Sequence, residues 1–128
     1  MNKLDKESVI GITALLVHAA NIDEIYSDHE KDLIKDFIKS YLNDDSDKIL
    51  KKAEEIENNS NQLLNFTNII KQKSMELKKD IIEHLWKVII SDKTVDQYES
   101  NLMRRICGLI YLPDKECAEI KLKLMSNK

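Results

Sequence analysis

The chain has 128 residues, 42% apolar and 34% charged, a balance that excludes a disordered chain and fits one compact domain over residues 1–128. Only 2 glycines and 1 proline are present, which disfavours a sheet protein because its many turns need those residues. The net charge of −3, with acids and bases mixed, predicts no nucleic-acid partner. No apolar run approaches the roughly 18 residues of a membrane-spanning helix, so we expect a cytoplasmic protein with no transmembrane segment.

Apolar residues recurring at spacings of three and four predict a helix from about residue 4 to 22 with one buried stripe. Gly11 within it would cost about 1 kcal/mol against alanine unless close packing uses the missing side chain. A second helix begins at Ser27, where Ser27 and Glu30 match a capping box. The later helices are predicted over about 46–57, 61–72, 75–90 and 96–111, and a seventh opens at Pro113.

Two side chains of these helices carry specific expectations. Ile56 is expected to face inward from the third helix, and Trp86 is expected to anchor the core from a central fifth helix. Cys107 and Cys117 lie in a helical region and are expected to be free thiols rather than a disulfide.

The same acidic pattern occurs twice, 69 positions apart: Asp, three residues, Ser or Asp, two residues, Glu. The residues are Asp23, Ser27 and Glu30 in the first turn, and Asp92, Asp96 and Glu99 in the second. Two helical hairpins related by an approximate two-fold axis would bury one shared core. The sequence therefore predicts an all-α, compact bundle of about seven helices with an internal two-fold helical-hairpin repeat.

The acids in these turns have two open interpretations. As capping boxes, each Ser/Glu or Asp/Glu pair stabilises a helix start by about 1 kcal/mol. As oxygen ligands, they could hold Ca²⁺ or Mg²⁺ together with backbone carbonyls and water. The candidate ligands are Asp92, Asp96 and Glu99, with Asp23 and Glu30 forming a second, weaker site.

No motif for catalysis is present. The chain has no nucleophile elbow, no glycine-rich phosphate loop and no Cys–His signature, so we expect no enzyme activity.

Three blocks of the sequence resemble the tellurite-resistance TerB-like family. They are ALLVHAANIDEIYSDHEKDLI (14–34), LLNFTNII (63–70) and IIEHLWKVIISDKTVDQYESNLMRRICGLIYLPDKE (81–116). The positions that match the family pattern are Leu85, Trp86, Val88, Asp92, Asp96, Tyr98, Glu99, Leu102, Arg104, Arg105 and Ile106, with Phe66 and Thr67. The sequence departs from the pattern at Glu24 and Lys93, where the family has glycine, and at Ser27, where it has an acid. The Lys93 ammonium would weaken a cation bound at Asp92.

The resemblance implies a TerB-like helical bundle that acts as a non-enzymatic scaffold or interaction module in tellurite resistance or a wider stress response. Its implied partners are other proteins, including membrane-associated complexes at the inner membrane. Two alternatives stay open. One is a divalent-cation sensor built on the two acidic turns. The other is a membrane-surface adaptor, in which Arg104, Arg105 and the C-terminal lysines form a basic patch.

Overall fold

The computed structural model describes residues 5–21, 27–43, 45–59, 64–90 and 97–126, and within these the side chains of all but 64–65 and 97–100. These ranges form seven α-helices and no strand, so the predicted all-α class is confirmed. The helices are α1 (Lys6–Ala20), α2 (Asp28–Tyr41), α3 (Ser46–Asn58), α4 (Leu64–Lys71), α5 (Met75–Ile90), α6 (Gln97–Leu109) and α7 (Asp114–Ser126). None of them is long and apolar enough to cross a membrane.

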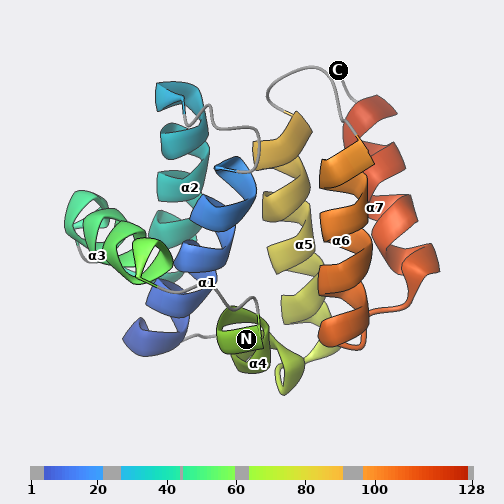
Figure 1. Ribbon diagram of the computed structural model, residues 1–128, viewed down its shortest axis with the longest axis horizontal. Coiled ribbons are helices and arrows are strands. Elements are labelled where there is room, and N and C mark those ends of the chain that lie inside the picture. The colour runs from blue at the N-terminus through green and yellow to red at the C-terminus, as the bar shows by residue number, and fades with distance from the viewer. Residues whose placement is uncertain (1–4, 22–26, 44, 60–63, 91–96, 127–128) are drawn as a thin grey trace.

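Helices α1 and α5 lie at the centre of the bundle (Figure 1). Helices α2 and α3 cover α1 on one side, α6 and α7 lie on the α5 side, and α4 crosses below. Helix α1 is buried on nearly every side: eleven of its fifteen residues, Val9–Val17, Ala19 and Ala20, are buried. The prediction of a single buried stripe was therefore wrong for α1, because four other helices pack around it.

The spacing of the helices follows the repeat seen in the sequence. Helices α1 and α5 begin 69 residues apart, and so do α2 and α6. Helix α3 packs on α1 and α2, and α7 packs on α5 and α6. These pairings agree with the predicted register, while the two-fold axis itself stays a prediction.

Gly11 allows α1 and α4 to approach closely. A Cβ atom built at Gly11 would collide with Cδ1 of Ile69 in α4. The predicted condition for a glycine inside this helix, close packing against a neighbour, is therefore met.

Helix α6 ends in a tight turn that leads directly into α7. The Leu112 N–H donates to the Cys107 carbonyl at 2.9 Å, and the Tyr111 N–H donates to the Gly108 carbonyl at 3.3 Å. This pair of bonds is a Schellman motif, which needs a left-handed residue after the helix. Tyr111 takes that role with a φ of 62° although it is not glycine.

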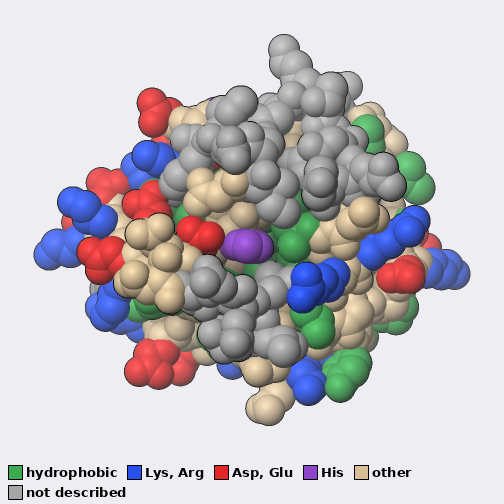
Figure 2. All heavy atoms as spheres, in the orientation of Figure 1, with side chains coloured by type: hydrophobic (Ala, Val, Ile, Leu, Met, Phe, Trp, Pro, Cys, Tyr) green, Lys and Arg blue, Asp and Glu red, His purple; other side chains and the backbone are tan. Residues whose placement is uncertain are grey.

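Ile56 is the clear exception to the predicted core. It is 38% exposed, because α3 lies on the outside of the bundle and buries only Ile49, Leu50 and Ala53. Trp86 is 3% exposed and the central position of α5 is confirmed. Figure 2 shows acidic and basic side chains interspersed over α2 and α3, with no region of a single charge sign there.

Candidate functional site

The first acidic turn ends in a complete capping box at the start of α2. The Ser27 hydroxyl oxygen accepts from the Glu30 N–H at 3.1 Å, and Glu30 Oε1 accepts from the Ser27 N–H at 2.8 Å. The Ser27 hydroxyl also donates to Glu30 Oε1 at 3.1 Å. Glu30 is only 1% exposed. The predicted cap is confirmed, and one oxygen of this candidate metal ligand is already engaged by Ser27 twice.

The other four candidate ligands lie outside the described side chains. Asp23, Asp92 and Asp96 fall in segments beyond the described ranges, and Glu99 is described only through the backbone of α6. Among the side chains that are described, no three His, Cys, Asp or Glu residues gather closely enough to hold a metal ion. The Ca²⁺ or Mg²⁺ site therefore stays a prediction.

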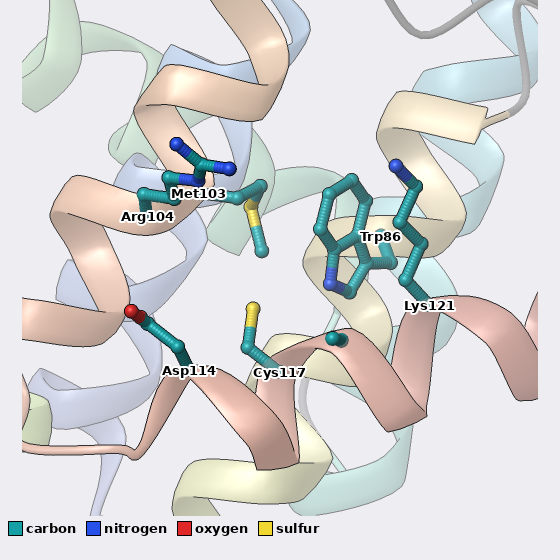
Figure 3. A pocket seen from close by; sticks show the side chains of 7 residues that line it. Trp86, Met103, Arg104, Asp114, Cys117 and Lys121 are labelled. Carbon is teal, nitrogen blue, oxygen red and sulfur yellow. The ribbon is translucent and has the colours of Figure 1, made fainter.

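A pocket of about 330 Å³ opens where α5, α6 and α7 meet (Figure 3). Its buried wall comes from one side chain of each helix: Trp86 of α5, Met103 of α6 and Cys117 of α7. Charged side chains complete the lining, with Arg104 and Lys121 as cations and Asp114 as the anion, beside Ala118. The pocket thus combines an apolar wall with charges that favour a small polar or anionic guest.

The Trp86 indole is held in this wall with its polar atom unused. Nζ of Lys121 lies 5.1 Å from the centroid of the Trp86 ring, which is within reach of a cation–π interaction. The Trp86 Nε1–H is buried and has no hydrogen-bond acceptor among the described residues. A buried donor left without an acceptor costs about 1–3 kcal/mol, so its presence calls for an explanation. In Figure 3 the indole nitrogen lies on the edge of the ring that faces the Cys117 sulfur.

The two cysteines form an unequal pair beside this indole. Both are free thiols, as predicted, and Cys107 is fully buried while Cys117 is 6% exposed and lines the pocket. The neighbouring Cys107 thiol is the main cause that lowers the pKa of Cys117, and the nearby Trp86 N–H and Lys121 charge lower it further. Burial and the Asp114 carboxylate oppose them. The neighbouring Cys117 side chain, with burial, raises the pKa of Cys107.

Two histidine pairs lie away from the pocket and join helices. Nδ1 of His18 on α1 lies 3.3 Å from a Glu57 oxygen on α3. Nε2 of His84 lies 3.6 Å from Asp80 on the same helix, and the Tyr41 hydroxyl of α2 donates to that carboxylate. Burial lowers the pKa of His84, and the Asp80 charge partly offsets this effect. These contacts link the helices together, and among the described side chains no third ligating group joins either histidine.

The family model for tellurite resistance protein TerB matches residues 9–122, which is most of the chain. The chain belongs to the TerB family. Comparison with curated proteins and with solved structures finds no match.

Some of the residues that carry the TerB resemblance line the pocket. Of the residues that carry the family resemblance, Leu85, Val88 and Ile106 are core side chains, whereas Trp86 and Arg104 line the pocket. Sequence reasoning treated Trp86 only as a core anchor and missed the pocket. The sequence did carry a signal for the pocket: a tryptophan and an arginine in the third TerB-like block, with the two cysteines close behind them. Helical periodicity alone does not show which helices pack together, so this signal could not be read as a pocket.

Proposed function

We propose that this TerB-family chain is a non-enzymatic module that binds another protein chain in tellurite resistance or a related stress response. The observation that carries the proposal is an exposed apolar stripe on α7, defined here as Ala118, Leu122 and Met125. Leu122 is 63% exposed and Met125 is 48% exposed, and Ala118 is exposed as well.

The stripe has the geometry of a helix-recognition surface. Its members are spaced by four and three residues, so they lie on one face of α7. Ala118 also lines the pocket, which extends the apolar surface from the stripe towards Trp86. Single exposed apolar side chains are ordinary, but a continuous row beside a pocket is typical of a protein contact. The partner expected here is an amphipathic segment of another protein, including one in a membrane-associated complex.

Site-specific photo-crosslinking tests the proposal. A photo-reactive amino acid is placed at Leu122, and at Ile56 of α3 as a control that is also apolar and exposed but lies on the opposite side of the bundle. We expect one defined protein to crosslink from position 122 and not from position 56. The purified partner should lose affinity for Leu122→Glu and keep it for Ile56→Glu. Equal crosslinking from both positions, or equal affinity of both variants, would contradict the proposal.

A divalent-cation sensor is the second candidate function, and the repeated acid pattern in the TerB-matched segments favours it. Calorimetric titration of Ca²⁺ and of Mg²⁺ into the wild type and into an Asp92→Asn, Asp96→Asn double variant tests it. Micromolar binding that the double variant abolishes would support the sensor. Absence of binding heat in both proteins would leave the acids as helix caps.

A cytoplasmic location with attachment to the inner-membrane surface belongs to the same proposal. Arg104 and Arg105 are both exposed on α6, where they could face anionic lipid. Co-sedimentation with vesicles should increase with the fraction of anionic lipid if this surface attaches. Binding that does not respond to anionic lipid would remove the membrane role.

A further inference from the structure

The pocket between α5, α6 and α7 has the size and the lining of a small-molecule site. Its volume of about 330 Å³ lies at the lower end of the range of about 300–1,000 Å³ that ligand pockets occupy. Met103 and Ala118 give it apolar surface, and a few polar side chains from three helices converge on it. The guest that fits is therefore a compact molecule with an apolar body and few polar atoms.

The Trp86 indole supplies an unused hydrogen-bond donor at the base of this pocket. Trp86 is 3% exposed, and its Nε1–H has no acceptor among the described residues. In Figure 3 the nitrogen lies on the ring edge that points into the space between Met103 and Cys117. The Cys117 sulfur borders that space, but a neutral thiol is only a weak acceptor. A ligand oxygen that displaces the flexible Met103 side chain would give the buried N–H the acceptor it lacks.

Three charged side chains of the lining set the charge of the guest. Arg104 and Lys121 bring two cations and Asp114 brings one anion, so the pocket favours a guest with a single negative charge. The Arg104 guanidinium makes no ion pair and no hydrogen bond with another residue that the structure describes. A guanidinium matches a carboxylate through two parallel hydrogen bonds, which favours this planar group. The Asp114 carboxylate would repel a second negative charge on the guest.

We propose that this pocket binds a small organic acid with one carboxylate and an apolar body. The carboxylate lies between the Arg104 guanidinium and the Trp86 N–H, and its oxygens accept hydrogen bonds from both. The apolar body packs on Met103 and Ala118. The Lys121 ammonium, which lies 5.1 Å from the centroid of the Trp86 ring, adds positive charge beside the same site. Binding therefore gives partners to a guanidinium and an indole N–H that have none among the described residues.

NMR of the ¹⁵N-labelled wild-type protein tests this without any variant. The chain has one tryptophan, so the indole N–H gives a single cross-peak of known origin. The probe is cyclohexanecarboxylate, whose ring adds no aromatic ring-current shift, and cyclohexanecarboxamide is its neutral match. We expect the acid to move the indole peak downfield until it saturates, and to bind about tenfold more tightly than the amide, because charge-assisted hydrogen bonds are stronger. An indole peak that does not move or does not saturate, or equal affinities for the two probes, would overturn the proposal.

A matched pair of arginine variants assigns the binding to this pocket. Arg104→Gln and Arg105→Gln each remove one exposed cation from α6, but only Arg104 lines the pocket. We expect Arg104→Gln to weaken binding of cyclohexanecarboxylate by about tenfold or more, because it removes a hydrogen bond between two charged groups, and Arg105→Gln to leave the affinity unchanged. Calorimetric titration of the probe into each variant measures both affinities. Equal losses in the two variants would refute the assigned site.

Discussion

The capping box at the start of α2 gives the sharpest test of how the acidic turns work. Glu30→Ala removes the carboxylate oxygen that accepts both the Ser27 N–H and the Ser27 hydroxyl. The Ser27 N–H then loses its acceptor at a helix start, where the backbone offers no replacement. A cap contributes about 1 kcal/mol to stability, and a hydrogen bond to a charged group contributes about 1.5–3 kcal/mol. Part of this loss is offset because the variant no longer buries a carboxylate. We expect a loss of about 2 kcal/mol in the free energy of unfolding.

The reciprocal geometry also predicts how the mutations combine. Ser27→Ala alone should cost about 1 kcal/mol, because it removes the acceptor of the Glu30 N–H. Either single change already breaks the paired bonds, so the double variant should cost about 2 kcal/mol rather than about 3 kcal/mol. Urea unfolding followed by far-UV circular dichroism measures each free energy.

Glu7→Ala is the matched control for this cycle. Glu7 lies in the first turn of α1, as Glu30 does in α2, but it is exposed and α1 is capped by Asp5 instead. Its loss should cost only the interaction with the helix dipole, about 0.3–1 kcal/mol. Equal costs for Glu7→Ala and Glu30→Ala, or fully additive costs at Ser27 and Glu30, would refute the reasoning.

Three further predictions concern the two glycines, the turn after α6 and a partly buried histidine. Gly108→Ala should stabilise by about 0.5–1 kcal/mol in urea unfolding, because its new Cβ meets open space, whereas Gly11→Ala should gain nothing, because its Cβ meets α4. Tyr111→Gly should raise the free energy of unfolding by about 0.5 kcal/mol. Release of the left-handed strain stabilises the protein by about 1 kcal/mol, and loss of the cation–π contact with Lys71 at 5.2 Å removes about half of that gain. No gain for Tyr111→Gly in a Lys71→Ala background would contradict that account. The lowered pKa of His84 means that the unfolded state takes up its proton first, so stability should fall between about pH 7 and pH 5. His84→Gln should flatten this part of the profile, and an unchanged slope would be the contrary result.

The sequence was sufficient for the helices because their signals are local. Helix α5 was predicted at its observed bounds, and the Ser27 cap was predicted down to its partner, since both depend on neighbours within a few positions. Ile56 was placed wrongly because periodicity identifies an apolar face but not how far a neighbouring helix extends along it. The pocket was missed for a related reason. Trp86 and Cys117 lie 31 positions apart in the chain, and only the packing of α5 against α7 brings them together.

The short turn after α6 fixes the backbone at both cysteines. The carbonyl that accepts the Leu112 N–H belongs to Cys107, so the bond that ends α6 also fixes the backbone of the buried thiol. The Pro113 carbonyl then starts α7, because it accepts the Cys117 N–H at 3.2 Å. Both sulfurs are therefore attached to backbone groups that the same short turn holds. The left-handed conformation of Tyr111 closes this tight connection, which brings the end of α6 and the start of α7 together beside the pocket.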